Sequence, residues 1–86
     1  MSEKQIGKVS PYFGHINVAA IELTDGALAV GDSIHIKGHT TDLNEKVDSI
    51  QIEHEQVSSA KKGESIGIKV PDHVREHDVV YKVVPD

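Results

Sequence analysis

A serine between two glycines is the first group in this sequence that could do chemistry. The segment Gly63-Glu64-Ser65-Ile66-Gly67 has the Gly-x-Ser-x-Gly spacing of a nucleophile elbow, and His73 and His77 follow it. In an elbow, the serine lies on a sharp turn between a strand and a helix of a large α/β sheet. Here alternating apolar residues follow the serine and end at Pro71. We therefore expect Ser65 to lie along a strand, and we predict no catalytic residue in the chain.

Two histidines four residues apart, His73 and His77, have a spacing that suits metal ligands. In a helical turn both imidazoles would share one face, but the segment is too short to hold them firmly. The other four histidines are His15, His35, His39 and His54. These are scattered over different expected turns and strands. A metal site, solvated histidines and a pH-sensitive contact remain alternatives; we predict solvated histidines, with no metal and no cofactor.

Basic and aromatic side chains could contact a partner. Lysines can contact phosphate groups, and Tyr12 and Phe13 beside Gly14 could stack on a base. Alternatively, lysines on outward strand positions keep sheet edges from pairing, and the aromatic rings plug the end of a barrel. The candidate residues for contact with a partner or with RNA are Tyr12, Phe13, His15, Lys37, Lys61 and Lys62.

The composition limits the class of protein. With 86 residues the chain is expected to be a single domain, 1–86, with an ordered core from about residue 5 to residue 84. Its 14 acidic and 9 basic residues give a net charge of −5, which argues against nucleic-acid binding by bulk charge. The absence of cysteine excludes disulfides and thiolate chemistry. No apolar run approaches the ~18 residues of a membrane span, so we expect a soluble cytoplasmic protein.

A repeated phrase indicates the elements that must position these residues. Gly31-Asp32 and Gly63-Glu64 each place a glycine and an acidic residue before an alternating apolar segment, which is typical of a tight turn that enters a strand. We expect strands near 5–10, 15–23, 46–57 and 79–84 as well. A change in the alternation near residue 20 predicts a β-bulge there. The stretch 39–45 is expected to form a loop or a hairpin tip, and 57–63 a single helical turn.

Six or seven short strands with regular turn signals predict an all-β protein, with a small closed barrel of Greek-key type. In such a barrel every second strand residue points inward. By this pattern His35 and Lys37 face water. The predicted core consists of Val9, Val18, Ile21, Leu28, Val30, Ile34, Ile36, Ile50, Ile52, Ile66, Ile68, Val70 and Tyr81.

The order and spacing of these elements resemble the second domain of the translational GTPases. The resemblance lies in 28–38, 47–52, 60–68 and 78–81, and covers most of the chain from Ile6 to Val84. It implies the barrel of the reductase, isomerase and elongation factor common domain, as in elongation factor Tu, elongation factor G and the bacterial-type initiation factor. The segment 14–18 corresponds to a tRNA-pocket segment of elongation factor Tu but lacks its arginine and threonine. A similar barrel ends the collagenase-like peptidases.

This resemblance implies a stand-alone, translation elongation factor-like binding module that contacts the ribosome, RNA or a translation factor. The chain has no Gly-x-x-x-x-Gly-Lys-Ser/Thr loop, so we predict neither nucleotide binding nor GTP hydrolysis. The alternative is a protein-protein adaptor, or a detached accessory barrel of a larger enzyme such as a collagenase-like peptidase. An independent enzyme is the third and weakest hypothesis. The oligomeric state is open.

Overall fold

The computed structural model describes residues 2–10, 18–39, 41–53, 55–71, 74 and 77–84, and these form ten strands with no helix. The strands are β1 (Ser2–Val9), β2 (Val18–Leu23), β3 (Leu28–Ala29), β4 (Ser33–Lys37), β5 (Asp42–Lys46), β6 (Ile50–Ile52), β7 (Glu55–Val57), β8 (Ser59–Ala60), β9 (Ser65–Lys69) and β10 (Val79–Val84). The all-β prediction is confirmed. Among the described residues no helix has the length and hydropathy needed to cross a membrane.

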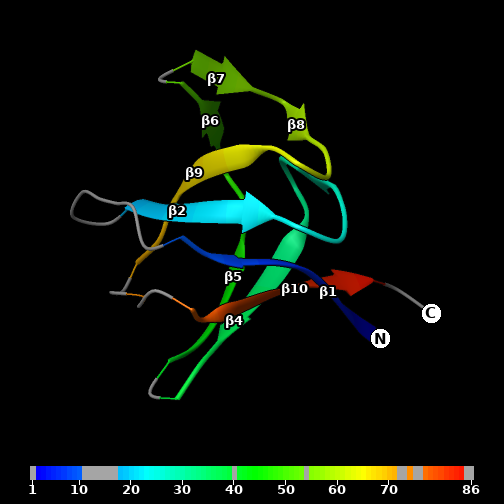
Figure 1. Cartoon of the computed structure of the whole chain (residues 1–86), viewed down its shortest axis with the longest axis vertical. Helices are drawn as coiled ribbons and strands as arrows, with labels where there is room; N and C mark the ends of the chain where they lie inside the picture. Colours follow the sequence, from blue (N-terminus) through cyan, green and yellow to red (C-terminus); the bar gives the residue numbers. More distant parts are fainter. Residues whose placement is uncertain are drawn as a thin grey trace.

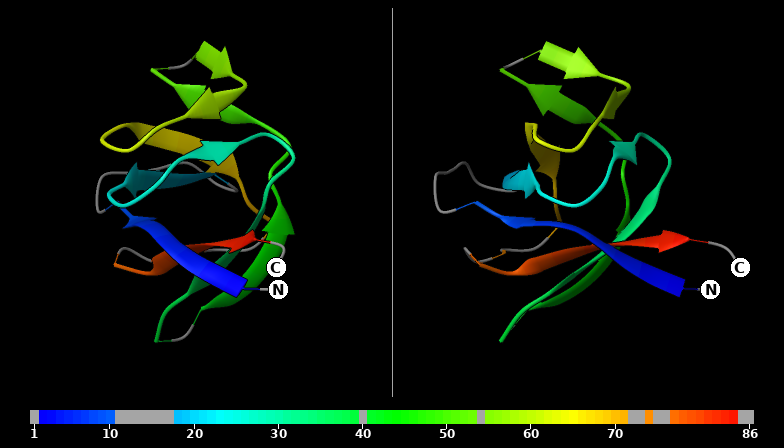
Figure 2. Two further views of the ribbon diagram at one scale, coloured as in Figure 1. Left: turned by 90° about the vertical axis from the view of Figure 1, so that its right-hand side faces the viewer. Right: turned by 45° about the vertical axis from the view of Figure 1, so that its right-hand side comes forward.

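Eight strands form one curled antiparallel sheet in the order β5-β4-β10-β1-β2-β9-β6-β7 (Figures 1 and 2). Strands β3 and β8 form a separate two-stranded ladder that adds Leu28 and Ala60 to the core. The backbone ladder ends at β5 on one side and at β7 on the other. The sheet is therefore a half-barrel, and the closed barrel of six or seven strands is not confirmed.

The two glycine-acid corners form as their chemistry predicts. Gly31 and Gly63 have φ values of 98° and 95°, a region that residues with a Cβ rarely adopt. The acidic neighbour completes each turn: Asp32 Oδ2 accepts a hydrogen bond from the amide of Ala29 at 2.9 Å, and Glu64 Oε1 accepts one from the amide of Lys61 at 2.8 Å. Each corner thus directs the chain into β4 or β9.

The interior of the half-barrel is aliphatic. Nine of the predicted core residues are buried: Val9, Ile21, Leu28, Ile34, Ile36, Ile50, Ile66, Ile68 and Val70. The core also includes residues that the prediction missed: Ile6, Ala19, Leu23, Val47, Ala60 and Val80. The prediction was wrong for Val30, which is 44% exposed because it lies in the turn before Gly31 rather than in a strand. Val18, Ile52 and Tyr81 are only partly buried.

The predicted bulge lies in a different strand. Strand β2 alternates without interruption and pairs with β9 in continuous register from Val18 to Glu22. The register shifts instead in β1, between Gln5 and Gly7 where β1 faces β10. The extra residue, Ile6, is buried, and its carbonyl oxygen accepts hydrogen bonds from the amides of Thr24 and Asp25. The bulge therefore turns an apolar side chain inward and ties β1 to the turn after β2.

Two stretches expected outside strands contain them. Residues expected as a loop form β5, which pairs with β4 from Lys37–Asp42 to Ser33–Lys46. The expected helical turn at 57–63 contains the end of β7 and all of β8. The sequence pattern did not indicate β5 or β8, because both contain polar side chains. Such side chains are common in an outer strand, which buries only part of one face.

Candidate functional site

An open groove with a volume of ≈ 700 Å³ lies between the edge strand β5 and the end of β9. The described residues of its lining are three apolar ones, Val18, Val70 and Pro71, and four charged ones, Glu45, Lys46, Asp48 and Lys69. Strand β5 pairs with β4 on its other side. The ladder between β6 and β9 ends at Ile68, just before the groove. The groove therefore lies between β5 and the end of β9, where the backbone ladder of the half-barrel is interrupted.

Glu45 is the unusual side chain of this groove. It alternates with Leu43 on the partly buried face of β5, and its backbone lies opposite the fully buried Ile34. Its Oε1 atom is buried and has no hydrogen-bond partner among the described residues. Burial raises the pKa of the Glu45 carboxyl to about 7, and the nearby carboxylate of Asp48 adds to this effect. The wall of the groove thus carries a carboxyl group with one buried oxygen atom that accepts no hydrogen bond from the described residues.

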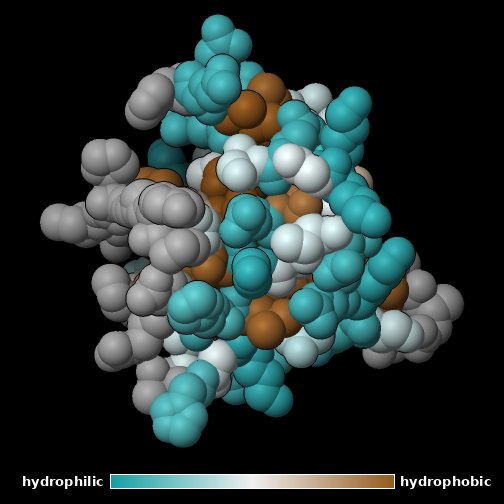
Figure 3. Space-filling model, viewed as in Figure 1, coloured by the Kyte–Doolittle hydropathy of each residue, from teal (hydrophilic) through white to brown (hydrophobic). Residues whose placement is uncertain are grey.

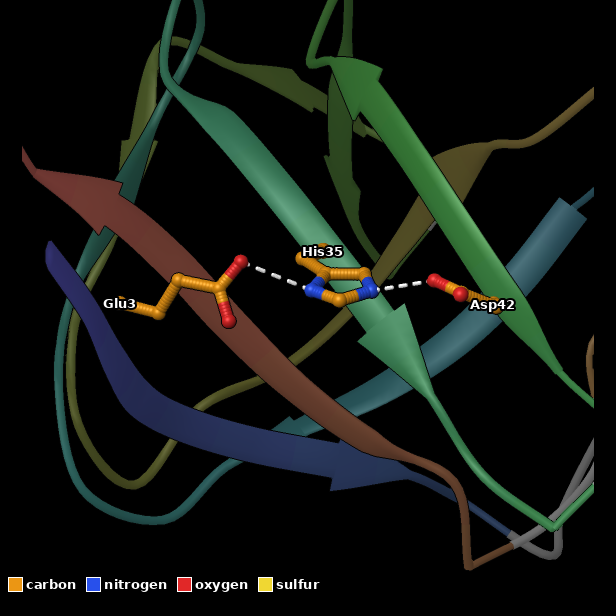
Figure 4. Close-up of polar contacts among 3 residues, drawn as sticks. All are labelled: Glu3, His35 and Asp42. Carbon is orange, nitrogen blue, oxygen red and sulfur yellow. Dashed lines mark hydrogen bonds and ion pairs between the residues drawn. The ribbon is translucent and has the colours of Figure 1, made fainter. Parts of the chain in front are cut away.

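A second polar cluster lies on the outer face of the sheet (Figure 4). His35 on β4 contacts Glu3 of β1 through Nδ1 at 2.8 Å and Asp42 of β5 through Nε2 at 2.5 Å. Strand β10 lies between β1 and β4, so Glu3 reaches across it. His35 lies on the outer face as predicted, but only 14% of its side chain is exposed because the flanking groups cover it. The ring connects the edge strand β5 to the rest of the sheet.

The stability of this cluster should depend on pH. The hydrogen bond to Asp42 raises the pKa of His35 above its ordinary 6.5, burial opposes this, and Glu3 adds to the rise. A raised histidine pKa stabilises the folded state fully below pH 6.5, and this contribution is lost as the pH rises through the folded pKa. We expect His35→Asn to lower the melting temperature by several degrees at pH 6 and by much less at pH 9.

Thermal melts of both proteins from pH 5.5 to 9 test this expectation. The difference between wild type and variant is the relevant quantity, because Glu45 also titrates in this range. A difference that stays constant across the range would contradict the assigned role of the imidazolium.

Of the six predicted contact residues, the structure describes three, the lysines, and these lie in two different segments. Lys37 is exposed at the end of β4, in the hairpin at the bottom of Figure 1. Lys61 and Lys62 are exposed in the connection from β8 to β9, which lies on the right of the same view. Tyr12, Phe13 and His15 lie outside the described residues. The view in Figure 3 shows apolar surface divided by hydrophilic side chains, without one broad apolar face.

Ser65 lies at the start of β9 and is exposed, and the strand continues to Lys69. A strand after the serine agrees with the expectation that Ser65 lies along a strand and not in a nucleophile elbow. His73 lies outside the described residues, so the expected pair with His77 has no structural description. Among the side chains that the structure describes, no three histidine or carboxylate groups form a metal-binding cluster.

Sequence reasoning missed Glu45 because it assigned 39–45 to a loop. A signal was present: Leu43 and Glu45 are two residues apart, so a strand would place both on one face. It also missed the pairing of His35, because Glu3 and Asp42 are 32 and 7 residues away in sequence.

Comparison with protein families finds no match. Among curated proteins, the chain is 46% identical over 78 residues to an uncharacterized protease of Methanocaldococcus jannaschii and 40% identical over 78 residues to a collagenase of Porphyromonas gingivalis. Each alignment covers 90% of this chain but 19% and 22% of the relatives, so the chain spans about a fifth of their length.

Solved structures give a consistent result for the fold. The C-terminal domain of a Geobacillus thermoleovorans protein assigned as a U32 peptidase superposes with a TM-score of 0.82. The match covers 94% of this chain and 93% of that domain, at 15% sequence identity. A selenomethionine variant of the same domain gives a TM-score of 0.79. At this identity the likeness shows the fold alone.

These findings correct the resemblance to translation factors. The proteins matched here by sequence are named as proteases, and the matched structures belong to a peptidase domain. The translation elongation factor-like assignment and its link to protein biosynthesis are therefore wrong. The Gly31-Asp32 and Gly63-Glu64 motifs form turns through positive φ and a capping carboxylate, and neither feature specifies a partner. The alternative of an accessory barrel of a collagenase-like peptidase has the better support.

Proposed function

We propose that this chain is a non-catalytic accessory domain of the kind found in U32 collagenase-like peptidases, and that it binds polypeptide for a separate catalytic part. One observation carries the proposal: the similarity occupies about a fifth of each protease, and the same unit matches nearly the whole of a separately solved C-terminal domain. A unit that forms its own core and matches only a minor segment of a protease is suited to a supporting role.

The chemistry of the described residues supports a binding role. Catalysis by a nucleophile needs a base within hydrogen-bond reach and a third group that orients the base. Ser65 is exposed on β9, whereas His35 is held between two carboxylates on the outer face. Both ring nitrogens of His35 are thus engaged by carboxylates rather than by Ser65, which supports a binding role.

Replacement of the matching segment in a relative tests this role. In the Porphyromonas gingivalis collagenase, we expect deletion of that segment to raise KM for a fluorescent collagen substrate by about tenfold or more and to change kcat by less than about twofold. Insertion of the present chain at the same place should restore KM. The ends suit such a graft, because Ser2 pairs with Val84 and the ends of β1 and β10 lie side by side (Figure 1).

The matched control is the same graft with Ile36→Asp, which should not fold and should not restore KM. Restoration by the unfolded graft would show that length alone matters. Hydrolysis of the substrate by the isolated chain would contradict the non-catalytic role.

A further inference from the structure

We propose that the groove beside β5 binds an extended polypeptide segment that carries a lysine or arginine, with Glu45 as the group that receives the cation. The proposal rests on the proposed function, since it supplies the binding site that an accessory domain of a peptidase needs. It has three supports: a sheet edge with no further strand partner among the described residues, a cavity of suitable size, and a buried carboxyl oxygen that finds no partner in the same part of the chain.

The first support is the backbone of β5. This strand is the last in the eight-stranded sheet and pairs with β4 on one side. Across the groove, Lys69 pairs with Val18 of β2, while the β6 ladder stops at Ile68. Extended peptides bind exposed sheet edges by adding a strand, with backbone hydrogen bonds for affinity and side-chain pockets for specificity.

The second support is the size and lining of the groove. Its ≈ 700 Å³ falls within the range of about 300–1,000 Å³ that is usual for ligand sites. Val18, Val70 and Pro71 supply apolar walls, and Val70 is buried. In an extended occupant, residues two apart point the same way. Apolar side chains on each side of the cation would therefore meet these walls.

The third support is charge. Oε1 of Glu45 is buried without a hydrogen-bond partner, and Asp48 places a second carboxylate at the same groove. Lys46 and Lys69 are exposed residues at the rim, and neither satisfies this buried oxygen. An ammonium or guanidinium group would supply the missing donor as a charge-assisted hydrogen bond. An apolar side chain would leave this oxygen unpaired, and an acidic side chain would repel it.

The first test uses a fluorescein-labelled peptide, Thr-Val-Thr-Lys-Thr-Val-Thr, and the same peptide with norleucine in place of lysine. By anisotropy at pH 8 we expect the lysine peptide to bind the full chain at least about tenfold more tightly. Glu45→Gln should remove this difference. The matched control is Glu55→Gln, which removes an exposed carboxylate from the other edge strand, β7, and should change affinity by less than about twofold.

Amide hydrogen exchange locates the peptide. Bound peptide should slow exchange in β5, from Asp42 to Lys46, and leave β7 unchanged. Binding should also weaken as the pH falls below 7, because protonated Glu45 cannot form the ion pair. Among the residues that the structure describes, Asp48, Lys46 and Lys69 are the other charged groups at the groove, so Glu45→Gln serves as the control for the pH dependence.

Several results would overturn the proposal. These are equal affinity for both peptides, no binding at millimolar peptide, and protection confined to β7. A dimer of the free chain that Glu45→Gln disrupts would make a second copy the occupant instead. If the graft restores KM but neither peptide binds, the groove is the wrong site and the accessory role still holds. If the graft does not restore KM, the accessory role itself is wrong.

Discussion

Replacement of Ile36 by aspartate is expected to unfold the domain. Ile36 is fully buried in β4, between Val80 of β10 and Leu43 of β5. The substitution loses the apolar burial and places a charge where no partner is available. A domain of this size has roughly 4–13 kcal/mol of stability in total, and the combined penalty of about 5 kcal/mol or more is a large share of it. Circular dichroism and amide NMR dispersion should both show an unfolded chain.

The control is Val30→Asp, because Val30 also belongs to the predicted core but the structure exposes 44% of it. A charge there remains in water, so we expect a change in unfolding free energy within about 0.5 kcal/mol. The pair compares a residue that the structure buries in β4 with one that it exposes in the turn before β4. If Ile36→Asp melts at the wild-type temperature, or if Val30→Asp unfolds the domain, the assignment of inside and outside is wrong.

Gly7→Ala is expected to cost at least about 3 kcal/mol, at the upper end of overpacking penalties. Gly7 lies in β1 directly after the bulge, opposite Leu23 of β2 and Val80 of β10. A Cβ at this position would overlap the carbonyl oxygen of Glu22 and press on Leu23 Cα. Both are backbone atoms, so no side-chain rotation relieves the clash and β1 must move away from β2. Chemical denaturation gives the change in unfolding free energy.

Gly67→Ala provides the matched strand substitution. A Cβ at Gly67 would lie 3.6 Å from Val18 Cγ1, an ordinary van der Waals contact. Because alanine restricts the unfolded chain more than glycine does, we expect a gain of up to about 1 kcal/mol. Equal effects at Gly7 and Gly67 would mean that the close approach of β1 and β2 has no energetic importance.

Local rules explain what could be predicted about the fold. Alternation placed Ile34 and Ile36, and likewise Ile66 and Ile68, on the inner face, because side chains of a strand point to opposite sides in turn. The two glycine-acid corners were also predictable, since a positive φ and a capping carboxylate involve only four neighbouring residues. These short-range features give an all-β chain, but they do not specify which strands become the outer ones.

The tertiary structure decided the properties that depend on neighbours distant in sequence. β5 is an edge with polar side chains, so its pattern alone resembled a loop. Glu45 acquires its raised pKa only where the curled sheet excludes water from one carboxyl oxygen, and His35 is paired only where β1, β4 and β5 come together. Burial and ion pairing depend on through-space proximity. The sequence by itself therefore determined the strands with alternating apolar residues and the two glycine-acid corners, while folding determined the edge strand β5, the groove and the carboxyl oxygen of Glu45 that has no partner among the described residues.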